Sequence, residues 1–126
     1  MTQSHSVFIG IGVDLVEIQR FSLLSNVAPM MKNRIFFNEE LTFNDKKLAG
    51  KFAAKEAVRK SLHEITSRVD FRDIIISNNE NGAPIVHING KYKTMLEKNG
   101  ISFQVSISYE SGLVVASAIA LKRLTS

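Results

Sequence analysis

A chain of 126 residues, 44% hydrophobic and 22% charged, is expected to form one soluble domain spanning residues 1–126. The absence of cysteine excludes disulfides, thiolate metal sites and cysteine nucleophiles. The net charge of +4 and the pI near 9.5 favour an anionic partner, but the basic residues are scattered and no basic–aromatic interleaving indicates a nucleic-acid surface.

Residues 7–13 alternate between larger apolar side chains on one face and Phe8, Gly10 and Gly12 on the other. This pattern predicts a strand whose bare face admits a helix, another backbone or a ligand. The apolar stretch is far shorter than the roughly 20 residues needed to cross a membrane, and it lacks the basic start of a secretory signal. We therefore expect a cytoplasmic protein without a membrane segment.

Helical patterns follow. Residues 15–25 are predicted to be helical, and Asn38 is expected to begin a second helical region after the apolar residues 35–37. The clearest helix covers residues 46–62, with a small and apolar stripe made of Ala54, Ala57, Val58, Ser61 and Leu62. The roughly opposite face contains Ala49, Ala53, Glu56 and Lys60. The small residues there would let another segment or a ligand approach the charged pair.

The second half of the chain is predicted to be mostly β-structure. Its expected elements are a strand at 71–77, a hairpin turn at Asn81-Gly82, a strand at 85–88, a helix at 91–98 that stops at Asn99-Gly100, a half-buried strand at 103–110 and a central strand at 113–121 buried on both faces. The predicted fold class is α+β, an antiparallel sheet with packed helices.

Asp14 and Glu56 are carboxylates in otherwise apolar or small-residue segments. Mg²⁺ takes one or two protein carboxylates and completes its octahedron with water and substrate oxygens, so a shared cation would explain both. Asp14 could instead be a helix N-cap in a capping box with Glu17. Glu56 could instead form a surface ion pair with Lys60, worth about 0.2–0.5 kcal/mol. Local pattern leaves these alternatives open.

Two blocks carry a family resemblance. Gly10–Ile18, and Leu48–Ala57 followed by Lys60, resemble the holo-acyl-carrier-protein synthases, which are small bacterial 4′-phosphopantetheinyl transferases. Residues 34–41, 81–84 and 105–108 are similar to further blocks of the family, in the same order. The resemblance therefore spans almost the whole chain, and the Phe-Ala-Ala-Lys-Glu-Ala block is specific.

The resemblance implies a fold and a reaction. The fold is that of the 4′-phosphopantetheinyl transferases. The reaction is Mg²⁺-dependent transfer of 4′-phosphopantetheine from coenzyme A to a serine of an apo acyl carrier protein, with release of adenosine 3′,5′-bisphosphate. The resemblance also implies a homotrimer with active sites between subunits. It does not select a fatty-acid, polyketide or other carrier pathway.

The resemblance also implies roles for individual residues. The expected metal ligands are Asp14 and Glu56, and the expected catalytic residues are Glu56 and Lys60. The expected coenzyme A contacts are Lys51, Lys60, Pro84, Ser108 and Tyr109. Arg20 is expected to meet the carrier protein, which is acidic. Lys60 could protonate the leaving group, and Glu56 could help to deprotonate the serine, directly or through water.

Three features depart from the family pattern. Tyr109 stands where the family has histidine, and it cannot become a cation near pH 6.5. The glycine-rich turn expected after the helix is replaced by residues 62–66, which can remove backbone donors to a phosphate. Lys51 stands where arginine is usual and lacks its bidentate fork. We expect retained chemistry with altered cofactor affinity or carrier preference.

Two other functions compete with this interpretation. A non-catalytic relative would bind a carrier protein without modifying it, and the departures around Tyr109 motivate that reading. A small basic nucleic-acid-binding protein rests on the pI alone and predicts salt-sensitive binding. The intact set of Asp14, Glu56 and Lys60 favours the enzyme, because a binding protein has no need to keep it.

Overall fold

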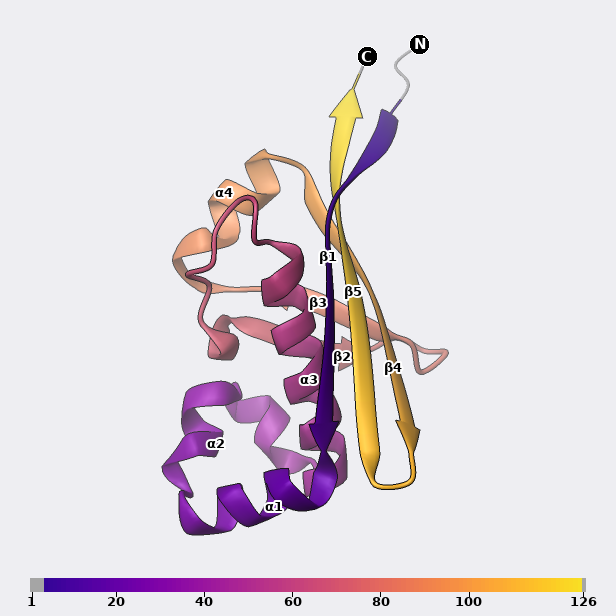
Figure 1. The fold of residues 1–126 in the computed structure, drawn as a ribbon. Coiled ribbons are helices and arrows are strands. Elements are labelled where there is room, and N and C mark those ends of the chain that lie inside the picture. Colours follow the sequence, from indigo (N-terminus) through magenta and orange to yellow (C-terminus); the bar gives the residue numbers. More distant parts are fainter. Residues whose placement is uncertain (1–3, 126) are drawn as a thin grey trace.

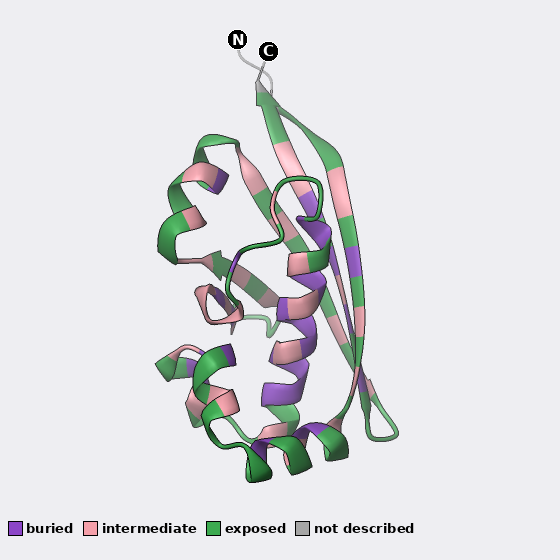
Figure 2. Cartoon of the chain, turned by 60° about the vertical axis from the view of Figure 1, so that its left-hand side comes forward, coloured by how far each residue is buried: buried purple, intermediate pink, exposed green. Residues whose placement is uncertain are grey.

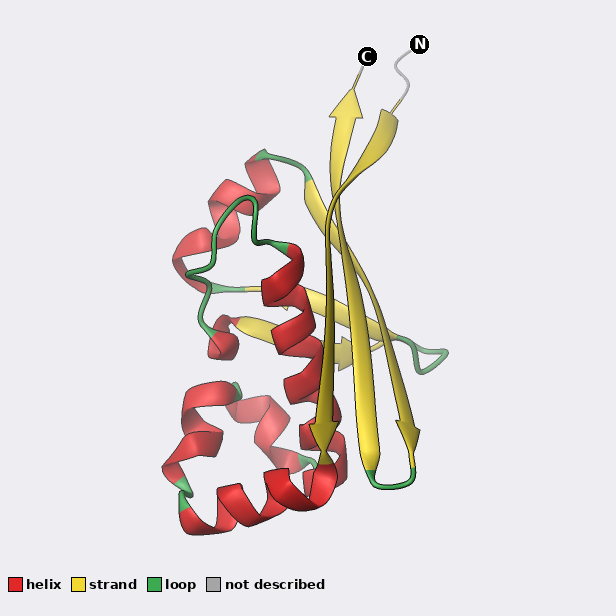
Figure 3. Cartoon of the chain, viewed as in Figure 1, coloured by secondary structure: helices red, strands yellow, loops and turns green. Residues whose placement is uncertain are grey.

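The computed structural model describes residues 4–125 as a mixture of helices and antiparallel strands (Figures 1 and 3). The elements follow the order β1 (Ser4–Glu17), α1 (Ile18–Val27), α2 (Met30–Ile35), α3 (Asp45–Ser61), β2 (Ile74–Asn78), β3 (Pro84–Ile88), α4 (Lys93–Lys98), β4 (Ile101–Glu110) and β5 (Leu113–Thr125). Short 3₁₀ turns cover Asn38–Thr42, Phe71–Asp73 and Gly90–Tyr92. The predicted α+β class is confirmed.

Strand β5 is the centre of a three-stranded sheet with the order β1-β5-β4, and both of its neighbours pair with it antiparallel. The prediction of a central strand over residues 113–121 is confirmed. Strands β2 and β3 form a separate two-stranded antiparallel sheet. The long helix α3 lies along one face of the three-stranded sheet, against β1 and β5 (Figure 1).

Helix α3 approaches the sheet closely because the strand residues beneath it are small. The residues of β5 that face the helix are fully buried: Val114, Ala116, Ala118 and Ala120. On β1, a Cβ at Gly10 would meet the carbonyl oxygen of Ser61, and one at Gly12 would meet the carbonyl oxygen of Ala57. The predicted bare face of this strand is therefore occupied by the backbone of a helix.

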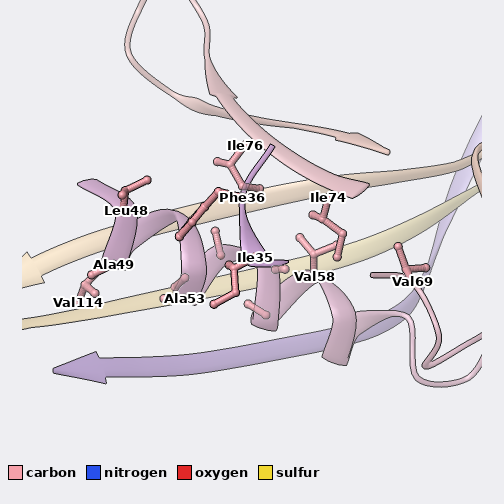
Figure 4. Packing of buried hydrophobic residues seen from close by; sticks show 14 of the residues in the cluster. Ile35, Phe36, Leu48, Ala49, Ala53, Val58, Val69, Ile74, Ile76 and Val114 are labelled. Carbon is pink, nitrogen blue, oxygen red and sulfur yellow. The ribbon is translucent and has the colours of Figure 1, made fainter. Parts of the chain in front are cut away.

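The hydrophobic core lies on both sides of α3. Figure 2 shows α3 buried along most of its length, whereas α1 is largely exposed. The predicted stripe of α3 is buried, and so are Ala49 and Ala53, which lie near Val114 of β5. Figure 4 also shows Phe36, Ile74 and Ile76 packed over the helix.

Strand β1 is longer than the predicted 7–13. It continues to Glu17, since Asp14 still pairs with Ala116 of β5. Helix α1 therefore begins later than predicted, at Ile18, and its N-cap, Glu17, makes no side-chain capping bond. The interpretation of Asp14 as the N-cap of a capping box is wrong, because Asp14 lies inside a strand.

Most of the second half of the chain follows the prediction. The strand predicted at 71–77 begins only at Ile74, since the residues before it form a 3₁₀ turn. The hairpin turn is confirmed: β2 and β3 pair antiparallel, and Gly82 has φ of 84°. Helix α2 was not expected, because six residues are too few to show a helical period. None of the helices within residues 4–125 is long and apolar enough to cross a membrane.

The face of the three-stranded sheet away from α3 is open to solvent. The prediction that β5 is buried on both faces is therefore wrong for this chain. We define the outer sheet face by the exposed apolar residues of β1 and β5, namely Ile11, Val13, Leu15, Leu113, Val115 and Ile119. The β4 residues on the same side are polar: Gln104, Ser106, Ser108 and Glu110.

Candidate active site

Asp14, near the end of β1, lies beside the last turn of α3. Its side chain is 13% exposed, and its Oδ1 lies 3.2 Å from Nζ of Lys60. The same ammonium group donates to the carbonyl oxygen of Val13 at 3.0 Å. This contact depends on Gly12, since a Cβ at that position would lie 2.8 Å from Cβ of Lys60. The glycine thus brings the strand that carries Asp14 against the helix that carries Lys60.

Glu56 lies one turn before Lys60 on α3 and is half-buried next to Asp14. Burial, a hydrogen bond with Asp14 and the charge of Asp14 together raise the pKa of Glu56 to about 7. Two neighbouring carboxylates that share a proton form a place where a divalent cation can replace the proton. The alternative of a surface pair between Glu56 and Lys60 is wrong, because Lys60 is paired with Asp14.

A hollow of about 450 Å³ connects these carboxylates with the start of α1. Its lining residues include Asp14, Glu56 and Arg20, together with Phe21 and Phe52. Arg20 itself is exposed. The structure therefore brings the two expected metal ligands and the expected carrier-binding residue to one side of the molecule.

A second hollow, of about 120 Å³, lies between α3, the β2–β3 hairpin and β4. Three of the expected coenzyme A contacts line it: Lys51, Pro84 and Tyr109. Lys51 is buried, its Nζ donates to the carbonyl oxygen of Ile76, and burial lowers its pKa. These groups lie around a different part of α3 from the hollow that contains Asp14 and Glu56.

Tyr109 is half-buried against α3. Its hydroxyl occupies the space that a Cβ at Gly50 would need, and burial raises the pKa of the phenol. The Nζ atoms of Lys46 and Lys47 lie 5.3 and 5.9 Å from the centre of its ring. Sequence reasoning missed both lysines, although a basic pair in the first turn of the motif helix was the available signal.

Ser108 is separated from the other expected contacts. It pairs with Val115 and is exposed on the outer side of the sheet, whereas its neighbour Tyr109 faces α3. Ser108 lines a hollow of about 390 Å³ together with Leu15, Leu113 and Val115. Within one chain, the expected site residues are therefore distributed over both faces of the sheet.

The segment that replaces the expected glycine-rich turn closes the end of α3. The backbone N–H groups of Ile65 and Thr66 donate to the carbonyl oxygen of Leu62 at 2.8 and 2.9 Å. His63 and Glu64 then line a hollow of about 400 Å³ together with Lys60. This hollow continues from the ammonium group of Lys60 along the edge of β1.

Sequence reasoning also missed a buried ion pair next to Glu56. Lys55 has a fully buried side chain, and its Nζ lies 2.7 Å from Oε1 of Glu40. Burial lowers the pKa of Lys55 to about 8, although Glu40 opposes this change. A lysine inside a block of small residues was the only signal, and nothing in the sequence identified its distant partner.

The donor set limits the metal that this site could hold. Among the described residues 4–125, no group of three or more histidine, aspartate and glutamate side chains is gathered as a metal cage. Asp14 and Glu56 offer two carboxylates and no imidazole. That set suits Mg²⁺, which keeps several waters and binds through one or two carboxylates, better than Zn²⁺, which prefers nitrogen and sulfur ligands.

Sequence comparisons with known proteins all indicate the same family. The model of the 4′-phosphopantetheinyl transferase superfamily matches residues 10–116. A holo-[acyl-carrier-protein] synthase of a Geobacillus species is 38% identical, covering 94% of this chain and 100% of the relative.

Solved structures agree with the sequence comparison. Holo-[acyl-carrier-protein] synthase from Neisseria meningitidis superposes with a TM-score of 0.81 at 32% identity, covering 90% of this chain and 98% of that one. The Helicobacter pylori enzyme in complex with coenzyme A gives a TM-score of 0.75 at 29% identity, covering 87% and 98%. The chain therefore belongs to the 4′-phosphopantetheinyl transferase superfamily and, within it, to the holo-[acyl-carrier-protein] synthases.

Proposed function

We propose that residues 1–126 act as one transferase domain that moves 4′-phosphopantetheine from coenzyme A to a serine of an apo acyl carrier protein, releasing adenosine 3′,5′-bisphosphate. The observation that carries the proposal is the meeting of Asp14, Glu56 and Lys60. Strand β1 and helix α3 are far apart in the sequence but are in contact at Gly12. The two carboxylates and the ammonium group lie close together beside this contact. A chain that only bound a carrier protein would not need this cluster.

Asp14 and Glu56 are the residues that would hold Mg²⁺. Their fit to a divalent cation is supported by their closeness: Glu56 is hydrogen-bonded to Asp14, and burial together with that bond and the charge of Asp14 raises the pKa of Glu56. When bound, the cation would neutralise and polarise the diphosphate oxygens of coenzyme A. Removing either carboxylate is expected to abolish turnover.

Lys60 and Glu56 are the proposed catalytic residues. Lys60 is more than half exposed, at 55%, so its ammonium group can leave Asp14 and donate to a phosphate oxygen of the substrate. It would stabilise, or protonate, the phosphate that departs. Glu56 faces the same space and would accept the serine proton, directly or through water. Phosphoryl transfer depends mainly on such positioning and charge neutralisation.

The second hollow is the proposed site for the nucleotide end of coenzyme A. Pro84 and Tyr109 supply apolar and aromatic surface there, while Lys51 and Lys60 supply positive charge on two sides of α3. Lys51 keeps two further N–H donors beyond its bond to Ile76, and these could reach a phosphate. Ser108 would contact coenzyme A from the outer side of the sheet.

We also propose a homotrimer with active sites between subunits. The outer sheet face supports it, because Ile11 and Leu15 are 60% and 62% exposed on a regular sheet surface. Large exposed apolar patches usually mark an interface. A shared site would also explain why Ser108 and Tyr109 lie apart from Asp14 in one chain, since a neighbouring copy could present them to the metal-binding carboxylates.

Arg20 is the proposed contact for the acidic carrier protein. It lines the same hollow as Glu56, and the exposed face of α1 also carries Leu23, Leu24 and Val27. A basic group beside apolar side chains suits a partner that is acidic around its reactive serine, because charge steers the encounter and apolar contact retains it. We propose that the enzyme works in the cytoplasm.

Intact-protein mass spectrometry tests the proposal. Purified apo acyl carrier protein is incubated with this protein, coenzyme A and Mg²⁺, and a parallel reaction contains EDTA. We expect a metal-dependent mass gain of one phosphopantetheine group. Asp14→Asn should abolish the gain, whereas Asp70→Asn, a matched change of an exposed aspartate before β2, should not. Carrier binding without any mass gain, from the folded wild-type protein, would instead support a non-catalytic relative.

A further inference from the structure

Helix α3 carries a row of three basic side chains spaced four residues apart: Lys51, Lys55 and Arg59. All three point at the chain segment that leads into and forms β2, and each donates to its backbone carbonyl groups. Arg59 Nε donates to Val69 at 3.0 Å. Lys55 Nζ donates to Phe71 at 2.9 Å and also to Ile74.

The row continues onto the hairpin itself, where Lys51 donates to the carbonyl oxygen of Ile76. One acid completes the arrangement. Glu40 accepts from Lys55 at 2.7 Å through Oε1, and its Oε2 accepts from the backbone N–H of Ile76 at 3.0 Å. Its Oε1 also accepts from the N–H of Phe37 at 2.9 Å.

These bonds satisfy backbone groups on the edge of β2 that pairs with no strand. One edge of β2 pairs with β3, and the other edge faces α3. The polar groups of Ile74 and Ile76 on that second edge are bonded by Lys51, Lys55 and Glu40 rather than by a neighbouring backbone. The edge is thus fixed at defined atoms, whereas purely apolar packing would allow the hairpin to slide along the helix.

Docking a hairpin through a buried ion pair costs free energy, because the charged groups lose their hydration. Apolar residues of similar size would not incur this cost. Directional bonds, however, specify register. Lys55 is fully buried, and it also lies 5.4 Å from the ring centre of Phe36. The arrangement therefore suits a place where the position of the hairpin matters more than its contribution to stability.

The position of this hairpin matters because it forms one wall of the second hollow. Asn78 and Pro84 are paired at the end of the β2–β3 ladder, and both line that hollow opposite Tyr109. Lys55, one residue before Glu56, therefore links the helix that carries the catalytic groups to the wall expected to hold the nucleotide of coenzyme A.

We infer that Lys55 and Glu40 are positioning residues that fix the β2–β3 hairpin against α3 and thereby set the affinity for coenzyme A. The inference rests on the proposed function for its kinetic consequence. Its structural part, the anchoring of the hairpin, stands on the contacts alone. Neither side chain touches the space open to substrate, so both act through the hairpin.

The test uses the full chain with Lys55→Met, which keeps a linear apolar side chain, and with the double change Lys55→Met and Glu40→Gln, which leaves no lone buried carboxylate. Arg59→Met is the matched control, because it removes a member of the same row whose carbonyl contact lies before β2. Hydrogen exchange with mass spectrometry reports on residues 74–88. Steady-state kinetics separate KM for coenzyme A from kcat.

We expect faster amide exchange over residues 74–88 in the Lys55 variants and a rise of about tenfold or more in KM for coenzyme A, with kcat changed about threefold or less. Arg59→Met should lower the melting temperature without either effect. Wild-type exchange and KM in the double variant would overturn the inference, as would equal effects of Arg59→Met. If the wild-type protein transfers nothing but the hairpin still loosens, the proposed function fails and the anchoring remains.

Discussion

Replacing Glu56 by glutamine should make the metal-free protein more stable while abolishing transfer. The folded protein holds the Glu56 proton up to about pH 7, compared with an ordinary value of 4.5. A group with a raised folded pKa contributes stability that is complete below the unfolded value and is lost as pH rises through the folded one. Wild-type stability should therefore fall across this window, and Glu56→Gln, which carries no charge, should not.

The magnitude follows from the same pKa. The full difference corresponds to about 3 kcal/mol, and solvent screening of a half-buried group reduces this to about 1–2 kcal/mol. We expect the advantage of Glu56→Gln in unfolding free energy to grow from near zero at about pH 5 to that value at about pH 8. Urea denaturation followed by circular dichroism, in EDTA, measures it.

Two comparisons sharpen this experiment. Glu97→Gln, a change of an exposed glutamate on α4, should show no pH-dependent gain. Adding Mg²⁺ should stabilise the wild-type protein at about pH 8 and leave Glu56→Gln unchanged, because the cation replaces the shared proton only where both carboxylates are present. A stability difference that is flat with pH, or equal stabilisation of both proteins by Mg²⁺, would refute the pairing of Glu56 with Asp14.

Four further changes test other parts of the argument. Gly12→Ala should cost about 1–3 kcal/mol in urea denaturation and most of the activity, because the new methyl group overlaps the backbone of α3; wild-type turnover would show that the close approach is not needed. Tyr109→His should lower KM for coenzyme A about threefold, since histidine can donate as a cation, and a rise would contradict the view of Tyr109 as a weaker substitute. Ile11→Glu, on the outer sheet face, should convert a trimer into monomers in light scattering, and an intact trimer would exclude that face as the interface. Arg20→Glu should raise KM for the carrier protein about tenfold at low salt and less at high salt; a salt-independent effect would argue against electrostatic steering.

Much of the fold could be predicted from local pattern. The alternation over residues 103–110, the apolar run of β5 and the Asn81-Gly82 turn each have a period or a turn chemistry that needs no distant partner. The end of β1 could not be predicted, because pairing with β5 keeps Asp14 in the strand. That information lies in the partner strand rather than in the residues around Asp14.

The candidate site shows the same limit more sharply. Asp14 and Glu56 stood out as isolated carboxylates that a shared cation would explain, yet local pattern left other roles open, since their meeting depends on how α3 lies across Gly12. Glu40 was invisible for the same reason. It lies in a short polar turn that the sequence suggests is exposed. In the structure it is buried, where it accepts hydrogen bonds from Lys55 and from the N–H of Ile76 on the edge of β2.

The alanines of β5 beneath α3 have a consequence for how this protein can vary. Ala116 and Ala118 are fully buried beneath α3, and they pair with Asp14 and Gly12 of β1, so their size bears on how closely α3 approaches the strand that carries Asp14. A single added methylene at either position is expected to move α3 away from the sheet without altering Asp14 or Glu56 themselves. A larger residue at either position is therefore expected only together with a smaller residue on the facing side of α3. The spacing of Asp14 and Glu56 thus restricts which residues the core beneath α3 can accept.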